Sequence, residues 1–113
     1  IAAAADANFT SIHVVVTSPY FRCIQTAAEI CAKLGSGVRV LVDHSLGEVY
    51  GPAVMGDTKP ANTVRPRDHL RAWCRSRGVR MMNTSIGDSP TWPEDFRSAR
   101  RRYAERFLTF LHR

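Results

Sequence analysis

The first half of the chain alternates a β-branched run, an amphipathic stretch and a second β-branched run. Residues 12–17, Ile-His-Val-Val-Val-Thr, predict a buried strand. Ser18 and Pro19 are residue types that favour a helix start, so a helix is expected over residues 19–34. Its buried face is formed by apolar residues spaced three or four apart: Ile24, Ala27, Ala28, Cys31 and Leu34. Residues 38–42 predict a second strand, which makes this half a βαβ unit with parallel strands.

The second half of the chain begins with a change of pattern. Residues 43–65 contain glycines and prolines without a hydrophobic period, which predicts a long loop. A short helix is expected over residues 66–77, and residues 79–90 are expected to be irregular. The last helix carries apolar residues at helical spacing from Phe96 to Leu111, and Thr91 with Glu94 matches a capping box before it. The whole predicts an α/β fold, a three-layer α/β/α sandwich with a mostly parallel sheet. We expect residues 1–113 to be a single partial domain, with a strand missing at each end.

Arginine dominates the charge of the chain. The net charge is +6, and 14 of the 16 basic residues are arginine. Arginine is well suited to bidentate contact with phosphate, so anionic ligands are one interpretation, and solvated helix faces are the other. An odd number of cysteines, three, without a close pair argues against a disulfide framework or a zinc site. No apolar run is long enough to span a membrane. We therefore expect no metal, no cofactor, no membrane contact and a cytoplasmic location.

The segment from Thr17 to Ala27 joins a strand end to a helix start. Open α/β sheets bind ligands in the crevice beyond the carboxyl ends of their strands. A helix N-terminus at that place offers free N–H groups and a partial positive charge to an anion. Arg22, on the first turn, adds a guanidinium that fits phosphate oxygens. These features indicate an anion site; the alternative is that Arg22 only pairs with a surface carboxylate.

The order Ser-Pro-x-x-Arg-x-x-Gln-Thr-Ala after a β-branched strand resembles the second arginine motif of the histidine phosphatase superfamily, also called phosphoglycerate-mutase-like. The six matching positions are Ser18, Pro19, Arg22, Gln25, Thr26 and Ala27. The run Arg-Cys-Ile-Gln-Thr is most similar to the eukaryotic branch that includes the ubiquitin-associated, SH3-containing phosphatases. Residues 46–51, Leu-Gly-Glu-Val-Tyr-Gly, fall where the family places a Leu-x-Glu segment after its third strand. The final amphipathic helix resembles the family helix that precedes the last strand.

The resemblance implies a phosphate-ester hydrolase. In the family, a histidine of an Arg-His-Gly motif attacks the phosphate, two arginines and a second histidine complete the pocket, and an acidic residue protonates the leaving group. Carried over to this sequence, Arg22 is the second phosphate-clamping arginine, and Ser18 belongs to the same phosphate-binding segment. Glu48 is the candidate general acid, or alternatively an exposed loop carboxylate. The implied partner is a phosphorylated small molecule or a phosphoprotein.

The sequence departs from the family at the nucleophile. It contains no Arg-His-Gly, and its histidines are His13, His44, His69 and His112. They fall in a predicted strand, a loop, a helix and a helix end, so we expect structural or solvent roles for them. The phosphohistidine step would then need residues outside this chain, and the chain alone is expected to be inactive.

Three hypotheses follow for the function. The first is a fragment of a phosphatase, with a mutase as a variant of it. The second is a non-catalytic phosphatase-like module for binding or assembly. The third is nucleic-acid binding, although no recognised nucleic-acid motif accompanies the basic residues that would provide it. These are Arg65, Arg67, Arg71, Arg75, Arg77 and Arg80, or Arg100, Arg101 and Arg102.

Overall fold

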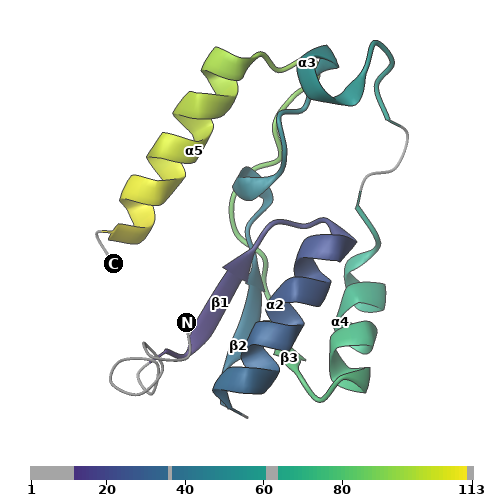
Figure 1. Ribbon diagram of the computed structural model, residues 1–113, viewed down its shortest axis with the longest axis vertical. Helices are drawn as coiled ribbons and strands as arrows, with labels where there is room; N and C mark the ends of the chain where they lie inside the picture. The colour runs from purple at the N-terminus through teal and green to yellow at the C-terminus, as the bar shows by residue number, and fades with distance from the viewer. Residues whose placement is uncertain (1–11, 36, 61–63, 112–113) are drawn as a thin grey trace.

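The computed structural model of the protein describes residues 12–35, 37–60 and 64–111 (Figure 1). The expectation for His112 lies outside these residues. The elements in chain order are β1 (Val14–Thr17), α2 (Phe21–Leu34), β2 (Arg39–Val42), the 3-10 turn η2 (His44–Leu46), α3 (Pro52–Met55), α4 (Arg67–Ser76), β3 (Arg80–Met81) and α5 (Phe96–Leu111).

The three strands form one parallel sheet in the order β1-β2-β3. Val15 lies beside Val40 in the first pair, and Val40 lies beside Met81 in the second. Helix α2 connects β1 to β2, because two parallel strands can be joined only through a crossover connection. The predicted α/β fold with a parallel sheet is confirmed.

The prediction that residues 79–90 are irregular is wrong in part, because β3 lies within them. The Met82 N–H donates to the Val40 carbonyl at 2.8 Å, and the Ile86 N–H donates to the Val42 carbonyl at 2.9 Å. A strand of two residues is too short to show an alternating pattern, so its pairing with β2 rather than its own sequence defines it.

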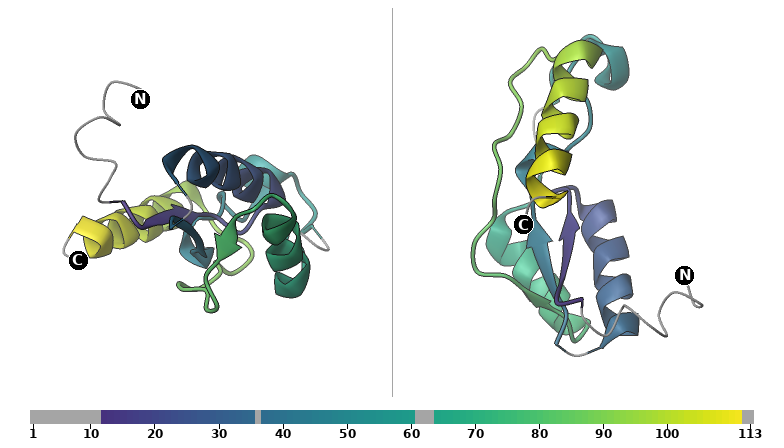
Figure 2. Two further views of the ribbon diagram at one scale, coloured as in Figure 1. Left: turned by 90° about the horizontal axis from the view of Figure 1, so that it is seen from below. Right: turned by 90° about the vertical axis from the view of Figure 1, so that its left-hand side faces the viewer.

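The core lies where α2 and α4 pack against β2 and β3 (Figures 1 and 2). Ile24 of α2, Val40 of β2 and Cys74 of α4 are fully buried in one cluster. Phe21 and Trp73 join the two helices by an edge-to-face contact with ring centroids 5.1 Å apart. The predicted buried face of the first helix is confirmed at Ile24, and likewise at Ala27, Ala28 and Cys31.

Helix α5 lies beyond the carboxyl ends of the strands, beside the segment that follows β2 (Figures 1 and 2). It begins at Phe96, and the Asp95 carboxylate caps it by accepting a hydrogen bond from the Ser98 N–H at 2.7 Å. The predicted capping box of Thr91 and Glu94 is therefore wrong. The Glu94 carboxylate has a different partner, described below. Among the described residues, no helix is long and apolar enough to cross a membrane.

Candidate phosphate-binding site

The candidate site lies where β1 ends and α2 begins. Helix α2 starts at Phe21, two residues later than predicted, with Tyr20 as its N-cap. Tyr20 is extended and buried; its ring packs against Gly47, and its carbonyl accepts hydrogen bonds from the N–H groups of Cys23 and Ile24 at 3.0 Å. No side chain caps the helix, so the N–H groups of Phe21 and Arg22, which precede the two bound to the Tyr20 carbonyl, are not used by a side-chain cap. They retain the partial positive charge that favours an anion.

Ser18 does not cap α2, contrary to its residue type. Its hydroxyl oxygen is buried and has no hydrogen-bond partner within the described part of the chain. An unpaired buried hydroxyl is costly, and it is free to bond a ligand that enters beside it. Ser18 lines a hollow of about 540 Å³ together with Thr17, Arg22 and Thr26. The hollow therefore brings together two of the predicted phosphate-binding residues.

Arg22 projects from the first turn of α2 and meets Glu48, although 26 positions separate the two residues. A guanidinium nitrogen of Arg22 contacts the Glu48 carboxylate, and its carbon lies 5.0 Å from the centre of the Tyr20 ring. The side chains of Arg22 and Glu48 are 62% and 45% exposed. Exposed ion pairs contribute only about 0–1 kcal/mol, so a phosphate could replace the carboxylate at Arg22 with little loss.

Tyr20 lies beside both of these charges. Burial raises the pKa of its phenol above the ordinary value, and the nearby negative charge of Glu48 raises it further. The phenol consequently stays protonated at neutral pH. It is a neutral surface on which the Arg22 guanidinium rests.

The loop that carries Glu48 is fixed at its start by Asp43, which directly follows β2 and is fully buried. One carboxylate oxygen of Asp43 accepts from the Ser45 N–H at 2.9 Å, and the other accepts from Arg106 Nε of α5 at 2.5 Å. Gly87, which has a φ of +75°, packs against Asp43 and Ser45. A Cβ at Gly87 would fall 2.1 Å from a carboxylate oxygen of Asp43. Only glycine fits that approach.

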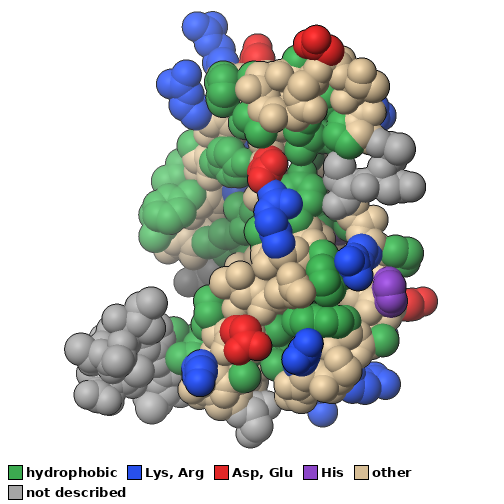
Figure 3. All heavy atoms as spheres, turned by 45° about the vertical axis from the view of Figure 1, so that its right-hand side comes forward, with side chains coloured by type: hydrophobic (Ala, Val, Ile, Leu, Met, Phe, Trp, Pro, Cys, Tyr) green, Lys and Arg blue, Asp and Glu red, His purple; other side chains and the backbone are tan. Residues whose placement is uncertain are grey.

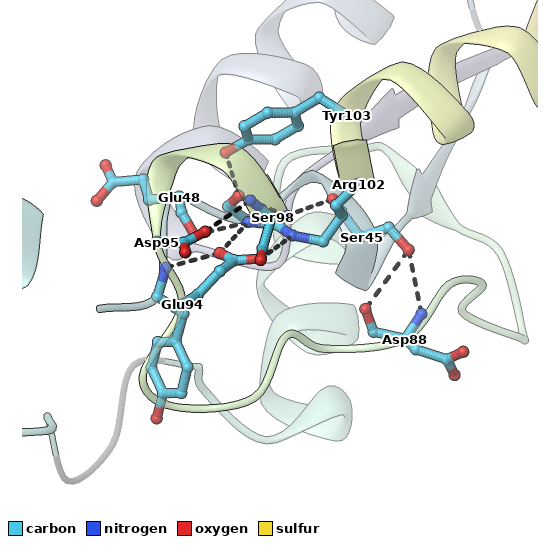
Figure 4. Close-up of polar contacts among 10 residues, drawn as sticks. Ser45, Glu48, Asp88, Glu94, Asp95, Ser98, Arg102 and Tyr103 are labelled. Carbon is cyan, nitrogen blue, oxygen red and sulfur yellow. Dashed lines mark hydrogen bonds and ion pairs between the residues drawn. The ribbon is translucent and has the colours of Figure 1, made fainter. Parts of the chain in front are cut away.

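Arg102 of α5 holds the remainder of this loop (Figure 4). Its guanidinium donates to the carbonyls of Gly47 at 2.8 Å and Glu48 at 3.1 Å, and also to that of Ser45. The next residue, Tyr103, donates its hydroxyl to the Gly47 carbonyl as well. The backbone position of Glu48 is therefore set by a helix about 50 residues further along the chain.

Glu94 anchors Arg102 from the other side (Figure 4). Its two carboxylate oxygens accept from the guanidinium at 2.7 and 2.8 Å, and one of them also accepts from the Tyr50 N–H at 2.9 Å. These hydrogen bonds, first that from Arg102 and then that from Tyr50, lower the pKa of Glu94 despite its burial. The absence of a side chain at Gly51 lets the backbone of Glu94 pass close to it, because a Cβ at Gly51 would lie 2.1 Å from the Glu94 carbonyl oxygen. We call Asp43, Glu94, Arg102 and Arg106 the loop clamp.

The described histidines lie outside the hollow beside Arg22, although His44 lines a neighbouring hollow together with Tyr20 and Gly47. Neither His13, His44 nor His69 is among the residues that line the hollow beside Arg22. His44 is in η2, where its backbone N–H donates to the Ile86 carbonyl at 2.9 Å. His69 is exposed on α4. No group of three or more histidine, cysteine, aspartate or glutamate residues that could hold a metal ion occurs in the described ranges.

Sequence reasoning selects Ser18, Arg22 and Glu48 as candidates but does not identify the loop clamp. Glu94 was assigned to a helix cap, and Arg102 was one of several arginines on an exposed helix face. The available signal was a charge immediately after a buried strand, at Asp43, because an acidic residue at that position needs a partner. Its partner, Arg106, is 63 positions away, so no local pattern could identify it.

The chain is an α/β protein whose parallel sheet has a helix start and an arginine at its carboxyl edge, an arrangement in which α/β proteins commonly bind anions. In comparison with family models, residues 2–111 match the histidine phosphatase superfamily (branch 1). The match covers almost the whole chain, and the protein belongs to this superfamily. No curated protein and no solved structure matches the chain.

Proposed function

We propose that this chain forms the phosphate-clamping and proton-donating part of a phosphate-ester hydrolase site. One observation carries the proposal: Arg22 and Glu48, which the family motifs single out, meet at the carboxyl edge of the sheet. Membership of the superfamily supports phosphate chemistry in general. In this proposal Arg22 and the Ser18 hydroxyl bind the phosphate, together with the start of α2.

The contact between Arg22 and Glu48 suggests an order for phosphate binding and for protonation of the leaving group. A phosphate dianion that enters the hollow competes with the Glu48 carboxylate for the Arg22 guanidinium, and bidentate binding favours the phosphate. Glu48 is then released beside the ester. Glu48, freed from Arg22, takes up a proton from solvent. It gives this proton to the leaving oxygen when the bond from phosphorus to that oxygen breaks, and the phosphoryl group passes to a nucleophile outside these 113 residues.

The loop clamp fits this role. A general acid must lie within hydrogen-bond reach of the oxygen that it protonates. Arg102 binds the Glu48 carbonyl itself, so the backbone of the acid is fixed while its side chain is free to move between Arg22 and a ligand. Arg102 is thus a positioning residue rather than a catalytic one.

The finer assignments are part of the same proposal. The Arg-Cys-Ile-Gln-Thr run supports a relation to the eukaryotic ubiquitin-associated, SH3-containing branch. A hollow of about 540 Å³ suits a small phosphate ester or a phosphorylated side chain. Three free cysteines support a reducing, cytoplasmic location.

A second candidate is a phosphatase-like binding module. It is favoured by one specific observation, the absence of Arg-His-Gly from the 113 residues. A pocket that retains Arg22 without a histidine nucleophile binds phosphate and does not form a phosphohistidine. A mutase is a variant of the first candidate, in which the phosphoryl group is passed to a second hydroxyl instead of to water.

The test compares two leaving groups on the protein purified from its natural source, after its termini have been sequenced. p-Nitrophenolate leaves without help from an acid, whereas an alkoxide from glycerol phosphate needs a proton. Glu48→Gln should therefore lower turnover of glycerol phosphate by ~10²-fold or more, and that of p-nitrophenyl phosphate far less. Glu29→Gln, on the exposed side of α2, is the matched control.

Equal losses on both substrates would remove Glu48 from the acid role. Phosphate binding without any turnover would instead establish the second candidate. Loss of both activities in the Glu29→Gln control would show that the change in charge, rather than the site, is responsible.

A further inference from the structure

A second arginine-lined hollow lies at the opposite end of the sheet from Ser18 and Arg22. Its lining includes Arg39 at the start of β2 and Arg80 at the start of β3, whereas the candidate site lies where β1 ends. Because the strands are parallel, one hollow lies at the amino ends of the strands and the other at their carboxyl ends. The volume of the second hollow is about 720 Å³, and Arg71 and Arg75 of α4 complete its basic wall.

These four arginines, which we call the arginine quartet, are arranged in two like-charged pairs. Arg39 and Arg80 are direct neighbours in the register of β2 and β3, where like charges repel. Arg71 and Arg75 are four residues apart on α4, a spacing at which like charges also destabilise a helix. None of the four forms an ion pair with a described residue. Within the described part of the chain, the quartet makes one side-chain hydrogen bond, from the Arg71 guanidinium to the Asn83 side-chain oxygen at 2.7 Å.

We propose that the arginine quartet binds a compact anion that carries two or more phosphate groups. Such an anion would convert two repulsive pairs into charge-assisted hydrogen bonds. Figure 3 shows several Lys and Arg side chains on the face of the molecule around α4. The Asn83 side chain and the backbone beside Gly78 and Val79 add neutral polar groups to the same wall.

The lining favours a small ligand over a nucleic acid. A volume of about 720 Å³ lies in the range of sites for small molecules. Proteins that bind single strands add aromatic side chains on which bases stack, and the residues that line this hollow include no aromatic one. The apolar lining is provided by Val79, Met81 and Met82 instead.

The test is calorimetric titration of the protein with inorganic tripolyphosphate, at low and at physiological salt. The double variant Arg39→Gln with Arg80→Gln should bind it at least about tenfold more weakly, as expected for the loss of a charge-assisted hydrogen bond. Its matched control, Arg100→Gln with Arg101→Gln, removes the same charge from exposed positions on α5 and should leave the affinity within about twofold. The double variant should cause the same loss of affinity in an Arg22→Gln background, which separates this hollow from the candidate phosphate-binding site.

Three results would overturn the proposal. The first is no binding of tripolyphosphate by the wild type at low salt. The second is equal weakening in the quartet variant and its control, which would indicate unspecific attraction by net charge. The third is tighter binding of a short single-stranded RNA than of tripolyphosphate, lost in the quartet variant, which would make the surface a nucleic-acid interface.

Discussion

Replacing Arg102 by alanine should strongly destabilise the protein. The substitution removes both hydrogen bonds to the Glu94 carboxylate and those to three loop carbonyls. Glu94 would remain as a buried carboxylate with only the Tyr50 N–H as its partner. The loop that carries Glu48 would lose its principal contact with α5.

The magnitude follows from burial. The side chains of Arg102 and Glu94 are 12% and 6% exposed, so solvent screens the pair little. Removing one partner of a buried ion pair costs about 3–5 kcal/mol. The lost carbonyl contacts belong to the same side chain and are counted within this figure, because such effects are not additive. Against a total stability of about 5–15 kcal/mol for a domain, the loss is large.

Urea denaturation followed by far-UV circular dichroism measures this difference, with sucrose added if the starting stability is low. Arg101→Ala is the control, because Arg101 is exposed, and its free energy of unfolding should stay within about 0.5 kcal/mol of the wild type. Hydrogen exchange of the amides of residues 44–50 reports the local effect and should accelerate in Arg102→Ala. A loss below about 1 kcal/mol, with unchanged exchange in this loop, would refute the loop clamp.

Two further predictions concern Glu94. Gly51→Ala should cost roughly 1–3 kcal/mol of stability by thermal or urea unfolding, since its Cβ would fall 2.1 Å from a backbone oxygen that cannot turn away, and wild-type stability would contradict the packing. The pKa of Glu94 is lowered in the folded protein, so its contribution to stability is complete above its ordinary pKa of 4.5 and is lost as the pH falls below that value. Glu94→Gln should therefore be less stable at pH 7, with a difference from the wild type that shrinks in acid; a constant difference down to low pH would count against the ion pair.

The βαβ unit could be predicted because its signals are local. The β-branched runs, the spacing around Ile24 and the helix-stopping Gly35 lie within one stretch of chain and agree with one another. The predicted start of α2 is two residues too early, because Ser18 and Pro19 are the residue types that favour a helix start. Burial of Tyr20 against Gly47 extends the backbone beyond that point, and this contact is between segments far apart in the sequence.

Other features could not be predicted, because they depend on distant partners. The two residues of β3 are defined by their pairing with β2. The Glu94 carboxylate could cap its own helix, as its spacing from Thr91 indicated, but Arg102 and the Tyr50 N–H bind it more strongly as a charged group in a buried place. At the site, the motif identified Arg22 and Glu48 separately, and only the fold shows that they meet.

The most direct test of the central claim is the affinity for inorganic phosphate, measured by calorimetry or by ³¹P line broadening. The wild type should bind phosphate, and Arg22→Gln should weaken it about tenfold or more, because a charge-assisted contact is lost. Glu48→Gln should bind phosphate at least as well as the wild type, since it frees the Arg22 guanidinium from its carboxylate. Lys33→Gln, which removes one positive charge from an exposed position in the last turn of α2, is the control. Equal phosphate affinity in the wild type and Arg22→Gln would contradict the account.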